Sequence, residues 1–129
     1  MATCVIDASA VFVDLQDELG AARAREWLRD AAISAVNLQE VVAKAVQKGL
    51  PADKVPDLLG RLRLTVHAHD EAQAMAAGLM RETTAARGLS LGDRSCLALA
   101  ATLGLPAVTA DRAWLHVAED VGVEVIAVR

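Results

Sequence analysis

The sequence predicts a single α/β domain over residues 1–129, a three-layer α/β/α sandwich around a mostly parallel central sheet of about five short strands. Short apolar runs alternate along the chain with longer segments of helical spacing, and this alternation is typical of βαβ units. With 129 residues and 54% hydrophobic composition, the chain is long enough for one core and too short for two domains. No repeat or low-complexity linker divides it.

The predicted strands are short apolar or alternating runs that end at turn residues or at helix starts. They cover residues 2–6, 31–36, 64–69, 107–110 and 123–128. Because a helical segment separates each strand from the next, the connections favour parallel pairing with helices on both faces of the sheet.

The predicted helices fill the segments between the strands, and glycine or proline ends most of them. In the first helix, Val11, Leu15 and Leu19 share one face before Gly20 ends it. The third helix is expected to begin at Asn37. The helices after the first are expected over residues 21–30, 37–48, 51–63, 70–87 and 90–104, with a last one from Arg112.

The composition limits the classes of function that this chain can serve. A net charge of −4 provides no overall basic field, so any binding of nucleic acid must depend on a metal ion and local arginines. No apolar run approaches the ~18 to 20 residues of a membrane span, and the first residues lack a basic leader, so we expect a cytoplasmic protein. Cys4 and Cys96 lie in an apolar strand and an alanine-rich helix, where we expect reduced thiols.

Four acidic residues stand at predicted helix starts. They are Asp7, Glu40, Asp93 and Asp111. Each has a local explanation. Asp7 and Asp111 follow strands directly and are placed as N-caps, whereas the other two lie three residues after Asn37 and Ser90, as in a capping box.

Topology gives these acids a second interpretation. In a parallel α/β sheet, every helix that follows a strand begins at the carboxyl edge of the sheet, which is where ligands of open α/β folds bind. Carboxylates gathered there would repel each other with an energy on the order of several kcal/mol. Oxygen ligands without His or Cys favour Mg²⁺ or Mn²⁺. The alternative is that the acids are spread along the edge, never meet, and only cap their helices.

The stretches "VIDASA", "NLQEV", "LSLGDRSCLALA" and "TADRAW" resemble the PIN-domain ribonucleases, specifically the small VapC toxins of bacterial type II toxin-antitoxin pairs. The resemblance covers essentially the whole chain. It implies a single PIN-like domain and a Mg²⁺- or Mn²⁺-dependent endoribonuclease that inhibits translation and growth. Gly92 stands where the family commonly has alanine.

The resemblance also implies roles for individual residues. It makes Asp7, Glu40, Asp93 and Asp111 the catalytic and metal-binding quartet, with Asp7 and Asp93 as the firmest ligands and the other two bound directly or through water. Ser9 and Thr109 match the family's hydroxyl residues, which are expected to orient carboxylates or waters.

Two kinds of protein partner follow from the same resemblance. A cognate antitoxin is expected to wrap the helices between Asn37 and Arg63 and to reach into the acidic cleft with a basic side chain. Homodimers are common in the family. A mean hydropathy of +0.33 is consistent with apolar surface that a partner covers, although an alanine-rich core would produce the same value.

Arg94 and Arg112 each follow an acid of the quartet by one residue. A guanidinium in that place could grip an RNA phosphate, or it could form a surface ion pair of little energetic consequence. The chain contains no Tyr and one Phe, so stacking of RNA bases on aromatic side chains is poorly supported.

Other classes of function fit the sequence less well. A phosphoaspartyl phosphatase needs a second acid two residues after the first, where this chain has Ser9. A phospho-acceptor signalling domain needs an acidic pair and a lysine after a late strand, where this chain has Thr109 and Asp111. A catalytically silent PIN-fold module that only binds protein remains the third alternative.

Overall fold

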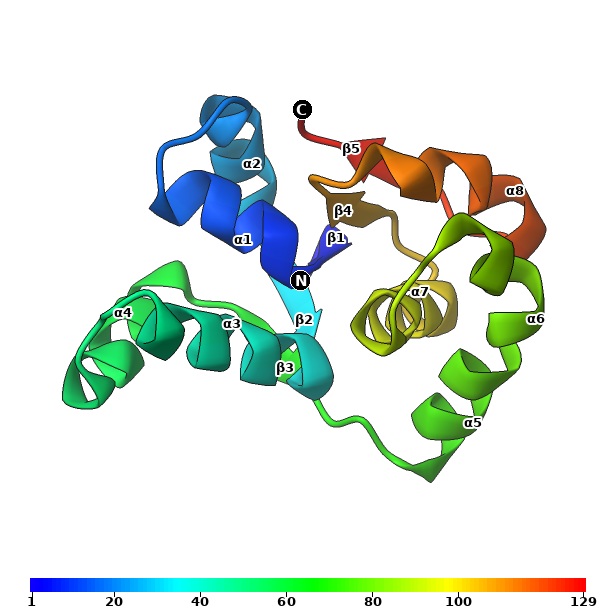
Figure 1. The fold of residues 1–129 in the computed structure, drawn as a ribbon, viewed down its shortest axis with the longest axis horizontal. Coiled ribbons are helices and arrows are strands. Elements are labelled where there is room, and N and C mark those ends of the chain that lie inside the picture. Colours follow the sequence, from blue (N-terminus) through cyan, green and yellow to red (C-terminus); the bar gives the residue numbers. More distant parts are fainter.

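The computed structural model describes all 129 residues and contains a five-stranded sheet with every neighbouring pair parallel (Figure 1). The strands are β1 (Cys4–Ile6), β2 (Ala31–Ser34), β3 (Thr65–His67), β4 (Ala107–Thr109) and β5 (Val125–Ala127). Their order is β3-β2-β1-β4-β5, so β1 is central. The predicted three-layer sandwich with a parallel sheet is therefore confirmed, and each strand is shorter than its predicted range.

Eight α-helices connect or flank the strands. They are α1 (Ala8–Leu15), α2 (Ala21–Leu28), α3 (Ala35–Gln47), α4 (Val55–Leu62), α5 (Glu71–Leu79), α6 (Arg81–Thr84), α7 (Leu91–Leu103) and α8 (Ala118–Val121). Short 3₁₀ turns cover Ala52–Lys54, Ala85–Arg87 and Arg112–His116. None of the helices combines the length and the apolar character that crossing a bilayer requires.

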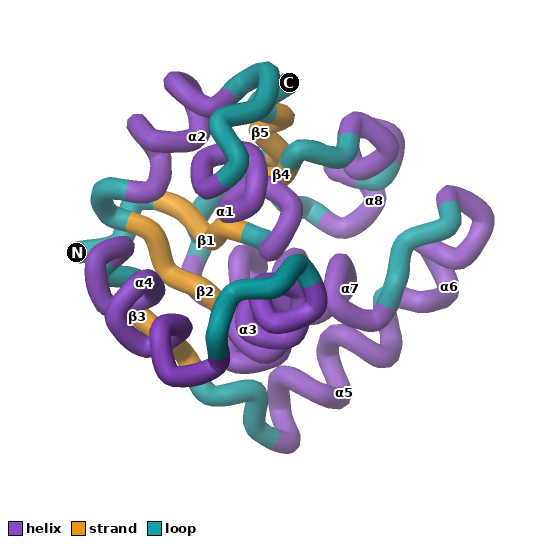
Figure 2. The backbone as a smooth tube through the Cα atoms, turned by 60° about the vertical axis from the view of Figure 1, so that its left-hand side comes forward, coloured by secondary structure: helices purple, strands orange, loops and turns teal.

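The two faces of the sheet carry separate hydrophobic cores because side chains alternate along each strand. Cys4 and Ile6 of β1 point into a core shared with α1 to α4, whereas Val5 points into a core shared with α7 and Trp114. Figure 1 shows β1, β2 and β4 between these two groups of helices, and Figure 2 shows the strands of the sheet in orange among the helices. Both cysteines are buried free thiols, as predicted.

Several helices differ from the prediction in their boundaries. The first helix ends at Leu15, and Leu19 is 83% exposed rather than part of an apolar face. Asp17 adopts a left-handed backbone there, and Gly20 passes so close to the carbonyl oxygen of Val128 that a Cβ would collide with it. The chain therefore leaves the helix early to pass beside the C-terminal segment.

The prediction that a helix begins at Asn37 is also wrong. Ser34 at the end of β2 caps α3 by accepting a hydrogen bond from the N–H of Val36, so Asn37 lies inside the first turn. Glu40 consequently has no capping-box role, and another explanation is needed for its position.

The predicted helix over residues 70–87 is divided into α5, α6 and a 3₁₀ turn. The hydroxyl of buried Thr84 donates to the carbonyl oxygen of Met80 at 2.8 Å, beside the break between the two helices. The last predicted helix is a 3₁₀ turn followed by the four-residue α8.

Candidate active site

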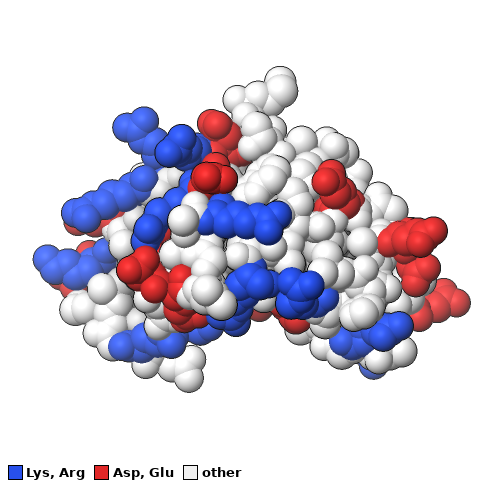
Figure 3. Space-filling view, turned by 90° about the horizontal axis from the view of Figure 1, so that it is seen from above, with Lys and Arg blue, Asp and Glu red and all other residues white.

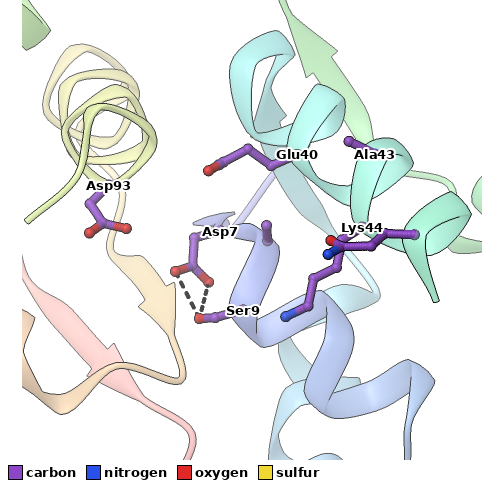
Figure 4. Close-up of a pocket in the computed structure, with 8 residues that line it drawn as sticks. Asp7, Ser9, Glu40, Ala43, Lys44 and Asp93 are labelled. Carbon is purple, nitrogen blue, oxygen red and sulfur yellow. Dashed lines mark hydrogen bonds between the residues drawn. The ribbon is translucent and has the colours of Figure 1, made fainter.

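The carboxyl edge of the central strand carries an acidic cavity of about 380 Å³ (Figure 4). Asp7 follows β1, Glu40 comes from the second turn of α3, and Asp93 comes from the first turn of α7. The side chains of all three line this cavity, together with Ser9 and Lys44. Three acids far apart in the sequence therefore face one space.

Asp7 is the most buried of these acids, with 4% of its surface exposed. It caps α1, because its Oδ1 accepts a hydrogen bond from the N–H of Ala10 at 2.9 Å. Ser9 Oγ donates to both carboxylate oxygens, at 2.8 and 2.9 Å, and Thr109 Oγ1 donates to Oδ2 at 2.7 Å. The carboxylate is therefore a helix cap and, in the same orientation, a wall of the cavity.

The two hydroxyls are themselves held by backbone groups of the segment after β4. Ser9 Oγ accepts from the N–H of Ala110, and Thr109 Oγ1 accepts from the N–H of Asp111, both at 3.0 Å. Because a backbone N–H occupies an acceptor position of each oxygen, the hydroxyl hydrogens are directed to the carboxylate of Asp7. This network fixes both carboxylate oxygens of Asp7.

Burial also changes the charge behaviour of two acids. It raises the pKa of Asp7 to about 6, against the lowering effect of its hydrogen bonds to Ala10, Thr109 and Ser9. Burial likewise raises the pKa of Asp93, and the charge of Asp111 adds to the increase, whereas hydrogen bonds from Ser90 oppose it. Negative charge at these positions is costly without a cation nearby.

Asp93 and Asp111 both cap their helices, as their sequence positions predict. Ser90 and Asp93 form a complete capping box at the start of α7. Asp111 accepts from the N–H of Ala113 at the start of a 3₁₀ turn. Asp111 is exposed and does not line the acidic cavity, although its charge reaches Asp93.

Lys44 is a cavity residue that sequence reasoning missed. On α3, Glu40, Ala43, Lys44 and Gln47 follow the spacing of one helical face, and all four line the cavity. The ammonium of Lys44 lies 4.7 Å from the centre of the Phe12 ring, and it is the one cation among the lining residues. Lys44 lies four residues after Glu40, and this spacing indicates in the sequence that the two side chains share one face of the helix.

The two arginines singled out in the sequence do not line this cavity. Arg94 donates to the carbonyl oxygen of Leu89 at 2.9 Å and lines a different cavity, between α7 and α5. Arg112 is exposed and donates to the carbonyl oxygen of Arg129 at 3.3 Å.

Comparison with known families decides the class of this fold. The family model described as PIN domain matches residues 4–120. The chain belongs to the PIN domain family. The match includes every acid of the predicted quartet, and the resemblance seen in the sequence motifs is confirmed. PIN domains are generally nucleases, which makes a hydrolase of nucleic acids the general class for this chain.

Several solved structures with a similar fold are described as toxin-antitoxin or VapBC structures. DNA-bound VapBC from Salmonella typhimurium matches with a TM-score of 0.74 and 20% identity, covering 100% of both chains. A toxin-antitoxin complex from Klebsiella pneumoniae matches at 0.73 and 16%, covering 98% of both. VapBC-5 from Mycobacterium tuberculosis matches at 0.62 and 23%, covering 98% of this chain and 99% of that one. Among curated protein sequences, none matches.

The donors around the cavity of this PIN domain fit a hard divalent ion in chemical type, because they are carboxylate oxygens. No three His, Cys, Asp or Glu side chains lie together as a group that could hold a metal. Mg²⁺ is usually bound through one or two carboxylates and keeps several waters. Asp7 and one of its two acidic neighbours would supply two such carboxylates, and PIN nucleases typically use divalent metals.

Proposed function

We propose that this PIN domain is a Mg²⁺- or Mn²⁺-dependent endoribonuclease and the toxin of a VapC-type toxin-antitoxin pair that inhibits translation and growth. The observation that carries the proposal is the position of Asp7. Its carboxylate is buried at the end of the central strand, its pKa is raised to about 6, and it faces a cavity with Asp93 and Glu40. A buried acid that resists ionisation next to two others is a typical arrangement for binding a cation.

Each side chain would have a definite task in the cleavage of RNA. Asp7 and Asp93 would hold the ion, and Glu40 and Asp111 would bind it directly or orient its waters. A bound divalent ion neutralises the scissile phosphate and lowers the pKa of water. Ser9 and Thr109 keep the carboxylate of Asp7 in one orientation. Water would attack phosphorus in line with the P–O3′ bond, and breaking that bond would leave a 5′-phosphate and a 3′-hydroxyl.

Lys44 is the best placed cation for a contact with an RNA phosphate, since it lines the same cavity as the acids. Figure 3 shows that Lys and Arg side chains gather on the side of the molecule that carries α1 to α4, although the net charge is −4. Arg112 remains a candidate for contact with a phosphate further along the RNA strand. Arg94 is the weaker candidate, because it lines a different cavity and one of its N–H groups donates to the carbonyl oxygen of Leu89.

A cognate antitoxin is the protein partner that we propose. An apolar groove of about 380 Å³ lies between α1, α3 and α4, and Phe12, Leu15, Leu50 and Leu58 line it. The groove borders the helices that the sequence resemblance assigns to antitoxin binding, and the similar structures named above are toxin-antitoxin complexes. An antitoxin segment in this groove would bring a basic side chain into the acidic cavity.

Two further features belong to the same proposal. Met75 and Leu79 on α5 are 62% and 71% exposed, and such a surface suits a homodimer contact. The toxin would act in the cytoplasm, where its RNA substrates are.

Cleavage of end-labelled total RNA by the purified, partner-free protein tests the activity directly. We expect discrete cuts with Mn²⁺ or Mg²⁺, none with EDTA, and none with the Asp93→Asn variant. If the wild type and the variant are equally inactive on every RNA class while the cavity still binds Mn²⁺ or a protein, the chain is a silent binding module.

A further inference from the structure

We propose that Asn37 and Gly92 are positioning residues that together hold the carboxylate of Glu40 at the acidic cavity. The inference rests on the proposed nuclease function and assigns a role to two residues that have none in it. Asn37 supplies the hydrogen bond that orients Glu40, and Gly92 supplies the space that its carboxylate occupies.

Asn37 connects the starts of α3 and α7. Its side chain is 1% exposed, and its Nδ2 donates to Glu40 Oε1 at 2.8 Å and to the carbonyl oxygen of Gly92 at 2.9 Å. Both partners are acceptors only, so the amide must present its nitrogen to them. The side-chain oxygen is left buried without a partner. A buried polar atom without a hydrogen bond is costly, which indicates that the orientation of the nitrogen is what this position requires.

Gly92 leaves room for the carboxylate that Asn37 holds. A Cβ on Gly92 would lie 2.5 Å from Glu40 Oε1 and still nearer to Glu40 Oε2, closer than Cβ contacts in proteins allow. Gly92 lies in the first turn of α7 and is buried. Any larger residue would therefore move the carboxylate of Glu40 and not the helix, because the atoms in the way are the end of a flexible side chain.

The hydrogen bond from Asn37 on α3 and the space left by Gly92 on α7 both act on the carboxylate of Glu40. Glu40 is an exposed residue with a long side chain, and holding it in one conformation costs entropy. A neutral amide can hold it without cancelling its negative charge, whereas a lysine or arginine would compete with a bound cation. The carbonyl of Gly92, which also accepts from Asn37, ties the position of this amide to the helix that carries Asp93.

The first test compares Asn37→Ala with Gln73→Ala. Gln73 is a matched control, since it is also a buried amide that joins α7 to another helix and also leaves its oxygen without a partner. We expect both variants to lose stability, whereas only Asn37→Ala loses Mn²⁺ affinity by calorimetry and kcat for RNA cleavage, each by about 10- to 100-fold. Equal losses of affinity and kcat in both variants would overturn the proposal.

The second test compares Gly92→Ala with Gly78→Ala. A Cβ on Gly78 of α5 meets nothing within 4 Å, and both changes replace glycine inside a helix. We expect the melting temperature to stay equal or rise in both, because alanine favours helix. Mn²⁺ affinity and kcat should fall in Gly92→Ala alone. Unchanged affinity and kcat in Gly92→Ala would contradict the role given to this glycine.

A double-mutant cycle separates positioning from general structural damage. In a Glu40→Ala background, neither Asn37→Ala nor Gly92→Ala should reduce Mn²⁺ affinity further, because the group they position is absent. Additive losses would show that the two residues act through something other than Glu40. Failure of the nuclease proposal would appear differently, as a wild-type protein that binds Mn²⁺ with this coupling pattern but cuts no RNA.

Discussion

The acidic cavity joins two regions that hold their polar groups in opposite ways. Its floor, made by Asp7 and Ser9 and held by the buried hydroxyl of Thr109, is a closed hydrogen-bond network at the end of β1. Its α3 wall, made by Glu40, Lys44 and Gln47, is a row of exposed side chains on one helical face. In the floor, burial disfavours the charged form of Asp7. In the wall, water stabilises the charges of the exposed Glu40 and Lys44. Changes in the floor should therefore alter stability and activity together, and changes in the wall should alter activity alone.

The largest expected effect is that of Asp7→Asn. The change keeps the shape of the floor and removes its charge, so cleavage should fall at least about a thousandfold, equivalent to about 4 kcal/mol in the barrier. The metal-free variant should be more stable than the wild type at pH 7, because the buried charge is gone. Added Mn²⁺ should raise the melting temperature of the wild type and leave that of the variant unchanged. If metal-free Asp7→Asn were less stable than the metal-free wild type, the charge of Asp7 would not destabilise the folded protein.

The second effect is the pH dependence of stability without metal. Burial raises the pKa of Asp7 from 3.8 to about 6, so the folded chain keeps a proton that the unfolded chain loses. The contribution of Asp7 to stability is therefore highest below pH 4, falls as the pH rises from about 4 to about 6, and is constant above that. The decrease amounts to about 3 kcal/mol, at about 1.4 kcal/mol for each pKa unit. Denaturant unfolding in EDTA, with Asp7→Asn as reference, measures it, and parallel curves for the two proteins would contradict the assignment.

Thr109→Val should have the next largest effect on the floor. The hydroxyl donates to a buried carboxylate, and removing such a bond costs about 2 kcal/mol at pH 7. The loss should shrink below pH 4, where Asp7 is protonated. Thr84→Val is a matched control, since Thr84 is equally buried but donates to the neutral carbonyl of Met80. Its cost should be about 1 kcal/mol and independent of pH. If the loss of stability depended on pH in the same way in both variants, the effect of Thr109→Val would not come from its hydrogen bond to Asp7.

Lys44→Ala tests the wall. The side chain is exposed, so the free energy of unfolding should change by less than about 0.5 kcal/mol. Cleavage should fall about tenfold, or about 1.4 kcal/mol, mainly through KM. Lys54→Ala, which removes the same charge from an exposed 3₁₀ turn away from the cavity, should cleave like the wild type. Similar losses in both variants would mean that only the net charge matters.

Asp111→Asn should have the smallest effect. Asparagine is as good an N-cap as aspartate, so stability should change by less than about 0.5 kcal/mol. Because Asp111 is exposed and outside the cavity lining, its loss should reduce cleavage less than Asp93→Asn does. Equal inactivity of the two variants would place Asp111 among the essential ligands.

Local patterns in the sequence were sufficient to predict the parallel sheet and most of the helix caps. The alternation of short strands and helices predicted the parallel sheet, and the caps at Asp7, Asp111 and the Ser90–Asp93 pair were predicted from their positions. These features depend on residues within a few positions of one another, which is why sequence spacing identifies them. The cap at Ser34 was missed because both Ser34 and Asn37 are good capping residues, and the end of β2 decided between them.

Only the tertiary structure decided which side chains share the cavity. The hydroxyl of Thr109 reaches Asp7 across 102 residues because β4 pairs with β1, and no local pattern encodes that pairing. The same holds for Glu40 and Gly92, which meet because α3 packs beside α7. Asp111 has the same kind of sequence position as Asp7, yet it is exposed and outside the cavity lining. Sequence determined that acids begin these helices, and packing determined which of them face one another.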